Sequence, residues 1–120
     1  MSPFDFRRLD AYRLAIEFVG AARSIIAALP RGEGHLADQL YRASTSIVLN
    51  VAEGSGEFRS AEKARFYRIA RRSGSECAAI LDILAAHDLA APDAIDAGVA
   101  LLDRIVAMLT RMVLKAEEAP

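Results

Sequence analysis

Cations gather in the middle of the chain, within fourteen residues that contain a single acid, Glu62. In a helix, three of the arginines recur at positions i, i+3 and i+7, so they lie along one side. A stripe of this kind can neutralise phosphates, and the neighbouring Phe58 and Tyr67 could stack on bases. The alternative is a solvated face, or ion pairs with acids such as Asp96 and Asp103 across the fold or between subunits. The candidate nucleic-acid-binding residues are Arg59, Lys63, Arg65, Arg68, Arg71 and Arg72.

A second set of polar residues falls on or beside apolar helical stripes. Asn50 stands next to Val51, and Glu53 follows three residues after Asn50 on the same helical face. A buried Asn needs hydrogen-bond partners. One interpretation is an enzymatic pocket around Asn50, Glu53 and Glu76. The other, which we favour, is a structural network that fixes helix register and oligomeric state. Its predicted members are Gln39, Ser46, Asn50, Glu53, Ser73 and Glu76.

The remaining chemistry-bearing residues indicate no catalytic or metal site. His35 and His87 have no His or Cys at metal-ligand spacing, and the hydroxyls of residues 44–46 have no base nearby in sequence. The glycines of residues 54–56 lack the Lys-Ser/Thr ending of a phosphate loop. Cys77 falls at a core position, where it packs as a small apolar group. We therefore expect no enzymatic activity, no cofactor and no metal.

The elements that must position these residues are helices. The 120 residues include 24 alanines and are 53% apolar, and alanine has the highest helix propensity. Apolar residues recur at three- and four-residue steps in four stretches, which short breaks containing Pro, Gly or Ala separate. The sequence predicts an all-α, single-domain protein over residues 1–120, an antiparallel up-down-up-down four-helix bundle. The predicted helices span about 6–29, 36–53, 61–89 and 92–117.

Within this bundle we expect Asp5 to cap the first helix, Ser60 to cap the third, and Pro92 to open the fourth. The second helix is apolar on more than one side near its end, which predicts burial on several sides. This surplus of apolar residues points to contacts between subunits. The predicted core stripe of the first helix, widened by Ala15, Ala22 and Leu29, is Leu9, Tyr12, Ile16, Val19 and Ile26.

The net charge of −1 conceals an uneven distribution. Residues 1–72 carry 12 basic and 8 acidic residues, whereas residues 73–120 carry 3 basic and 8 acidic residues. The N-terminus shows no basic region followed by an apolar run, so we expect no secretory signal. The longest helical stretch without charge, residues 43–52, is far shorter than the ~20 residues that span a bilayer. Together with a single cysteine, these features predict a cytoplasmic protein.

Three segments carry a family resemblance. Residues 6–12 read Phe-Arg-Arg-Leu-Asp-Ala-Tyr, and residues 39–54 read Gln-Leu-Tyr-Arg-Ala-Ser-Thr-Ser-Ile-Val-Leu-Asn-Val-Ala-Glu-Gly. The third segment has Phe66, Ile69, Ala70, Ser73 and Glu76. Together they resemble the bacterial four-helix bundle proteins encoded by intervening sequences of 23S rRNA. The resemblance covers nearly the whole chain.

The resemblance implies a homo-oligomer, a pentamer in the relatives, with no established enzyme activity. A related branch serves as the accessory protein of diversity-generating retroelements and engages nucleic acid and a reverse transcriptase. Those relatives are strongly basic and this chain is not, which counts against that role. Val48 stands where the family has Pro, and Arg72 where it has Gly. The family's Pro implies a helix kink, and its Gly implies a close helix approach. We therefore carry over neither feature to this chain.

The sequence thus predicts a non-catalytic, homo-oligomeric scaffold or adaptor. RNA or DNA is the hypothetical ligand of residues 59–72, which we call the basic segment. The alternative is a module that binds only protein, its partner being the product of a neighbouring gene. A reverse-transcriptase accessory protein is a further alternative. No membrane association is expected.

Overall fold

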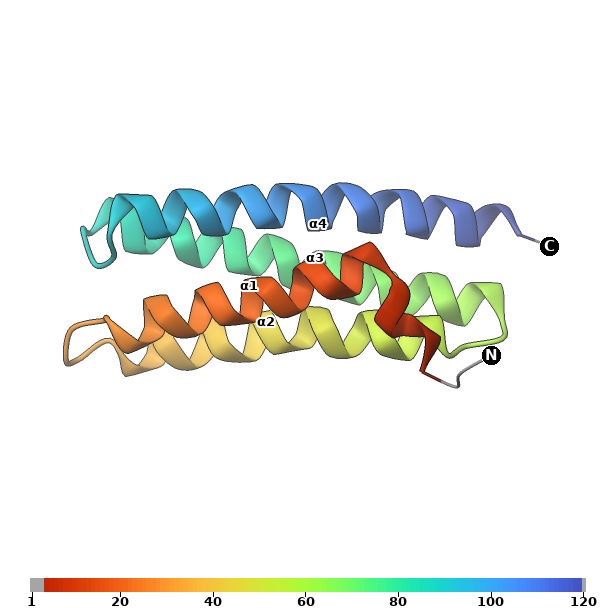
Figure 1. Ribbon diagram of the computed structural model, residues 1–120, viewed down its shortest axis with the longest axis horizontal. Coiled ribbons are helices and arrows are strands. Elements are labelled where there is room, and N and C mark those ends of the chain that lie inside the picture. Colours follow the sequence, from red (N-terminus) through yellow and green to blue (C-terminus); the bar gives the residue numbers. More distant parts are fainter. Residues whose placement is uncertain (1–3, 120) are drawn as a thin grey trace.

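The computed structural model describes residues 4–119, and nearly all of them are helical (Figure 1). A short 3-10 turn precedes four long helices. None of the helices in this described part is long and apolar enough to cross a membrane. The elements are η1 (Asp5–Arg8), α1 (Asp10–Ala27), α2 (Gly34–Ser55), α3 (Ser60–Ala86) and α4 (Pro92–Glu118).

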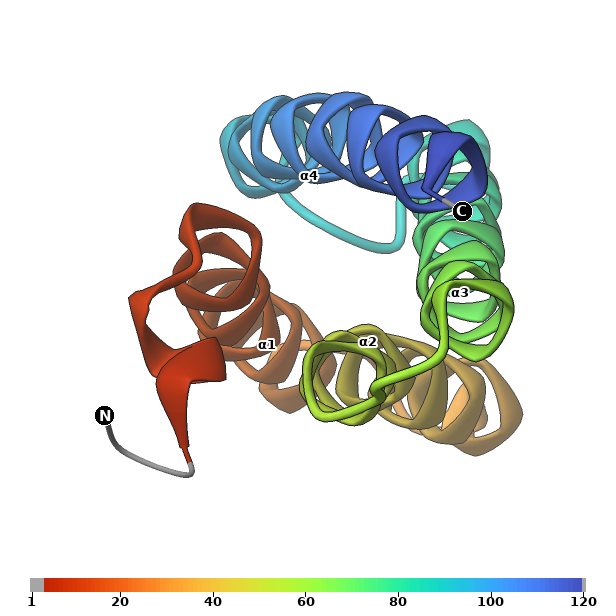
Figure 2. The same cartoon turned by 90° about the vertical axis from the view of Figure 1, so that its right-hand side faces the viewer.

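The four helices alternate in direction along a rod of 49 × 25 × 22 Å (Figure 1). α1 packs against α2 and α4, and α3 packs against the same two helices. Each helix therefore has two neighbours, and the four surround a common centre when viewed from the end that holds both termini (Figure 2). The predicted all-α four-helix architecture is confirmed.

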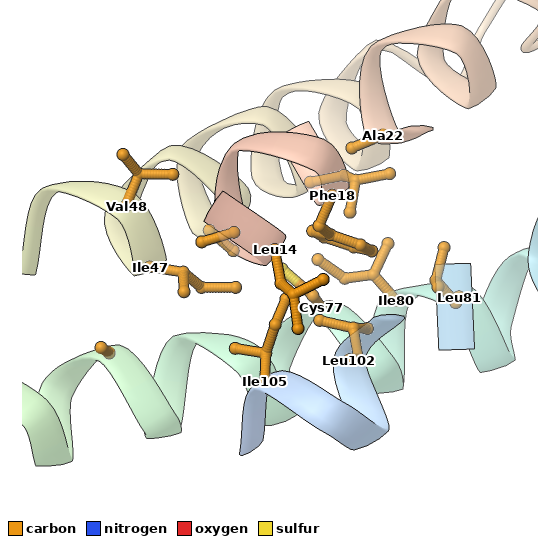
Figure 3. Packing of buried hydrophobic residues seen from close by; sticks show 14 of the residues in the cluster. Leu14, Phe18, Ala22, Ile47, Val48, Cys77, Ile80, Leu81, Leu102 and Ile105 are labelled. Carbon is orange, nitrogen blue, oxygen red and sulfur yellow. The ribbon is translucent and has the colours of Figure 1, made fainter. Parts of the chain in front are cut away.

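Each helix contributes large side chains to one continuous core. Phe18 of α1, Ile47 of α2, Leu81 of α3 and Ile105 of α4 are all fully buried (Figure 3). Removing such a side chain from water contributes about 1.5–3 kcal/mol. The bundle is therefore favoured, because it buries the apolar stripes of all four helices at once.

The core face of α1 differs from the predicted stripe. Ile16 is 48% exposed, and Tyr12, Val19 and Ile26 are only half-buried. The prediction is wrong for Ile16 because α1 is apolar on two adjacent sides, and helical spacing alone does not say which side meets the other helices. The residues that α1 buries are Ala11, Leu14, Ala15, Phe18, Ala22 and Ile25.

The first helix also begins later than predicted. Leu9 is extended, with ψ at 132°, and it separates η1 from α1. The expected cap at Asp5 is wrong, because Asp5 lies within η1 and no side chain caps α1. The break turns η1 so that it packs against α2 as well as α1. The ring of Phe6 in η1 meets that of Tyr12 in α1 edge-to-face, with 4.9 Å between the ring centroids. η1 packs against α1 and α2 and reaches neither α3 nor α4.

The other helix ends lie within three residues of the predicted bounds. Ser60 is the first residue of α3 rather than its cap; Arg59 holds the cap position, without a side-chain hydrogen bond. Pro92 opens α4 as expected. His87 follows the last residue of α3.

Two glycines set the closest approaches of α3 to its neighbours. A Cβ on Gly54 of α2 would lie 2.6 Å from the Tyr67 ring, and one on Gly74 of α3 would lie 3.0 Å from a methyl of Val106. Arg72, at the family's usual glycine position, is exposed, so Gly74 makes the close approach two residues later. α2 continues without a break through Val48.

Candidate functional site

A polar groove lies between the first half of α2 and the middle of α3. Its volume is about 350 Å³. Four of the six residues predicted to form a polar network line it, which are Gln39, Ser46, Ser73 and Glu76. Arg42 and Ala43 complete the lining. Arg42 was not among the residues predicted for this network. Its spacing from Gln39 and Ser46, at i, i+3 and i+7, nevertheless places all three along one side of a helix.

The floor of this groove is a short hydrogen-bonded chain across the α2–α3 contact. The hydroxyl oxygens of Ser46 and Ser73 lie 2.9 Å apart. The Asn50 side-chain amide donates to the Ser46 carbonyl at 2.8 Å and to its hydroxyl at 3.0 Å. Ser73 is buried, and Ser46 and Asn50 are half-buried. Paired polar groups at a helix contact favour one register of the two helices.

The other predicted members of the network lie at its rim or outside it. Gln39 and Glu76 line the groove but are exposed, and neither makes a side-chain hydrogen bond within residues 4–119. Glu53 is exposed and does not line the groove. The three residues of the hypothetical enzymatic pocket, Asn50, Glu53 and Glu76, are thus not brought together around one cavity.

Lys63 of the basic segment points to the end of α2. Its ammonium donates to the carbonyl oxygens of Gly54 at 2.8 Å and Ser55 at 3.2 Å, which are among the last four acceptors of the helix; the Gly54 oxygen also accepts from the Glu57 backbone N–H. Burial lowers the pKa of Lys63, and the nearby Glu57 partly opposes this shift. Lys63 therefore serves as a C-terminal cap of α2.

Three of the arginines have partners within the chain. Arg68 pairs with Glu117 of α4 at 2.8 Å, and Arg71 donates to the Thr110 hydroxyl at 2.7 Å. The Arg65 guanidinium pairs with Glu62 at 3.2 Å. Asp96 and Asp103 pair with none of these arginines, so the expectation of those acids as partners within the chain is wrong. The acidic end of α4, not its beginning, lies beside the basic segment.

Arg59 and Arg72 are exposed, and their side chains make no hydrogen bond or ion pair with any residue in 4–119. Arg65, Arg68 and Arg72 are exposed and recur along one side of α3, and Arg68 and Arg71 both reach α4, at Glu117 and Thr110. Of the two predicted stacking residues, Phe58 is fully exposed in the turn before α3.

Tyr67 is 5% exposed, with its ring packed against Gly54. The prediction that Tyr67 stacks on bases is therefore wrong. At position 67 of α3 the aromatic side chain faces the core rather than the solvent.

Cys77 occupies the core position predicted for it and has no accessible surface. Burial, with a smaller contribution from Glu76, raises its pKa from 9.0 to about 12. The thiol is therefore protonated at neutral pH and is a poor nucleophile. Within the described residues no three His, Cys, Asp or Glu side chains are grouped to hold a metal.

Both the groove and the basic segment lie inside a region shared with a known family. The model of the 23S rRNA-intervening sequence protein family matches residues 7–111. The chain belongs to this family. The match covers α1, α2 and α3 entirely and most of α4, so it includes every residue of the polar network and of the basic segment. No curated protein matches the chain significantly.

Proposed function

We propose that this member of the family is a non-catalytic, homo-oligomeric adaptor that binds RNA or DNA through the outer side of α3. The observation that carries the proposal is the set of exposed cations there. Arg65, Arg68 and Arg72 share one side of the helix, and Arg59 and the exposed Phe58 adjoin its first turn. Cations in a row suit a phosphate backbone, and an exposed ring suits an unpaired base.

The ion pairs of this surface leave it free to bind phosphate. The side chains of Arg68 and Glu117 are 50% and 48% exposed, and those of Arg65 and Glu62 are 50% and 41% exposed. Ion pairs at such exposure contribute only about 0–1 kcal/mol. A phosphate can therefore replace Glu117 or Glu62 at small cost.

Self-association is supported by apolar residues on the outer side of α1 and α2. Leu49 is 63% exposed, Ile16 48% and Tyr41 45%. Tyr41 and Ile26 also line a shallow hollow of about 390 Å³ between the two helices. Contiguous exposed apolar surface marks sites of contact between proteins, and the hollow at Tyr41 and Ile26 is such a surface. We propose this face as the one that joins the subunits.

The test is nucleic-acid retardation with the double variant Arg68→Glu, Arg72→Glu. Each lost phosphate contact reduces the slope of log affinity against log salt by about 0.9 on duplex DNA, so the double variant should lose about two units. The matched control is Arg104→Glu, an exposed cation on α4 away from the basic segment. Unchanged retardation by the double variant, or binding that ignores salt, would contradict the proposal.

Recognition of a protein partner is the second candidate. Leu114 is 54% exposed and Ile83 42%, in addition to Phe58. A specific protein recovered by the wild type after nuclease treatment, and lost with Phe58→Ser, would favour this function. The reverse-transcriptase accessory role has less support, because the net charge of −1 differs from that of the strongly basic relatives.

A further inference from the structure

The bundle is open at the end where both termini lie, because α1 begins late. Leu9 breaks the helix, and η1 turns away to pack on α2. α1 starts opposite Met108 and Met112, whereas α4 continues to Glu118. The first turns of α3 and the last turns of α4 therefore extend past α1. Figure 2 looks onto this end and shows η1 directed away from α3 and α4.

A cavity of about 360 Å³ lies at this opening, and we call it the terminal cavity. This volume is at the lower end of the range for small-molecule sites, about 300–1,000 Å³. Its walls are mostly apolar. The main lining residues are Leu9 from the segment before α1, Lys63 and Tyr67 from α3, and Met112, Lys115 and Ala116 from α4.

The Tyr67 hydroxyl gives the terminal cavity an unused hydrogen-bonding group. Tyr67 is 95% shielded from solvent, since only 5% of its surface is exposed. Its hydroxyl has no hydrogen bond to any residue in 4–119. No buried side-chain nitrogen or oxygen among the described residues lacks a partner, so this hydroxyl keeps contact with solvent at the cavity. A ligand oxygen in the cavity would replace water as its hydrogen-bond partner.

Two lysines add positive charge to the same cavity. Lys63 has three N–H donors, of which two bond to the end of α2, so one is left. Burial disfavours the charged form of Lys63, and an anion in the cavity would offset this effect. Lys115 is exposed at the rim, and Arg111 lines an adjoining hollow that shares Leu9, Met112 and Lys115. The acids nearby are Glu57, beside Lys63, Asp10, in the adjoining hollow, and Glu117, in a second hollow that shares Ser60, Ala116 and Ala119 with the cavity.

We propose that the terminal cavity binds a free medium-chain carboxylate, with its hydrocarbon chain against Leu9, Met112 and Ala116 and its carboxylate at Tyr67, Lys63 and Lys115. The apolar walls exclude a small inorganic anion as the best fit, and the two lysines disfavour an apolar cation. Met112 and Met108 have flexible side chains, so the walls can adapt to the chain of the ligand. This proposal is independent of nucleic-acid binding on the outer side of α3.

The test is calorimetric titration of the full-length protein with sodium decanoate at neutral pH, below the concentration at which decanoate forms micelles. Tyr67→Phe removes only the hydroxyl and should weaken decanoate binding about tenfold, as loss of a hydrogen bond to a charged group does. Lys115→Gln should weaken it about threefold, because an exposed charge is screened. Arg104→Gln, which removes an exposed cation of α4 that does not line the cavity, should bind as the wild type does.

Two further ligands test separately the contributions of the hydrocarbon chain and of the carboxylate. Acetate, an anion without a chain, and decyltrimethylammonium, a chain with a cation, should both bind far more weakly than decanoate. The proposal is overturned if decanoate does not bind, if decyltrimethylammonium binds as tightly, or if both cavity variants bind like the wild type. Sedimentation with phosphatidylglycerol vesicles in the absence of decanoate binding would assign the surface to lipid instead. If Tyr67→Phe unfolds by circular dichroism, the Lys115→Gln comparison decides.

Discussion

The middle and the beginning of α3 hold buried polar groups in opposite ways. In the middle, the Ser73 hydroxyl bonds to Ser46, which Asn50 also contacts. At the beginning, little of Tyr67 is exposed, but its hydroxyl has no partner among the described residues and is reached by solvent. Polar groups that bond to each other hold two helices in register, whereas a hydroxyl open to solvent contributes little to stability and is available to a ligand. Four predictions test this difference, from the largest effect to the smallest.

The tightest contact at the beginning of α3 is that of Gly54 with the Tyr67 ring. A Cβ on Gly54 would lie 2.6 and 2.8 Å from two ring carbons, so Gly54→Ala must displace the ring. We expect a loss of about 2–3 kcal/mol in the free energy of unfolding, typical of overpacking. Urea unfolding followed by circular dichroism measures it.

Gly20→Ala is the matched control for this substitution. Gly20 is exposed within α1, and an added Cβ would meet nothing within 4 Å. Alanine there should raise the free energy of unfolding by about 0.5–1 kcal/mol through helix propensity. Equal effects of the two substitutions would show that the Tyr67 ring is not held as the structure places it.

Cys77, one turn after Ser73, predicts a loss of stability in alkali. Its folded pKa of about 12 lies above the value of 9.0, so only the unfolded thiol loses its proton between these values. The folded state then binds more protons, so stability falls as pH rises above 9 and is about 1.4 kcal/mol lower at pH 10. Cys77→Ala should lack this component, which the difference between the two pH profiles of unfolding isolates. Parallel profiles would contradict burial of the thiol.

The hydroxyl pair in the middle of α3 should show measurable coupling. Ser73→Ala and Ser46→Ala should each lower the free energy of unfolding by about 1 kcal/mol, the usual net value of such a bond. The double variant should lose less than the sum of the two, because both remove the same interaction. Additive losses would show that the hydroxyls do not interact.

Tyr67→Phe should have the smallest effect on stability. Since its hydroxyl has no partner within the described residues, we expect a change of less than about 0.5 kcal/mol without ligand. Urea unfolding beside Ser73→Ala provides the comparison. A loss as large as that of Ser73→Ala would mean that the hydroxyls in the middle and at the beginning of α3 contribute equally to stability.

Much of the fold could be predicted from the sequence, because helix propensity and apolar spacing are local properties. All four predicted helices are present, and apart from the start of α1 their ends lie within three residues of the predicted bounds. Most of the predicted stripe of α1 packs against the core, but Ile16 does not and Phe18 does, since both recur at helical spacing and only contact with α2 and α4 distinguishes them. The break at Leu9 was also missed, because nothing local to Leu9 prevents a helix from continuing.

The candidate site was predicted in part for the same reason. Ser46 and Ser73 were both predicted as members of the polar network with Asn50, and the structure brings their hydroxyls together. Spacing did not reveal that Lys63 caps α2 or that Arg68 meets Glu117, since those contacts join residues whose separation depends on how far each helix extends.

The sequence by itself determined that the chain forms helices, how many there are, and which family it belongs to. Alanine content, short breaks and apolar spacing act within a few residues of each other, and a family match depends on residue order alone. Only the tertiary structure decided which arginines are paired, which face of α1 is buried, and that one end of the bundle is open. Those features depend on distances between helices, which arise when the apolar stripes pack and the late start of α1 leaves a cavity beside Tyr67 and Met112.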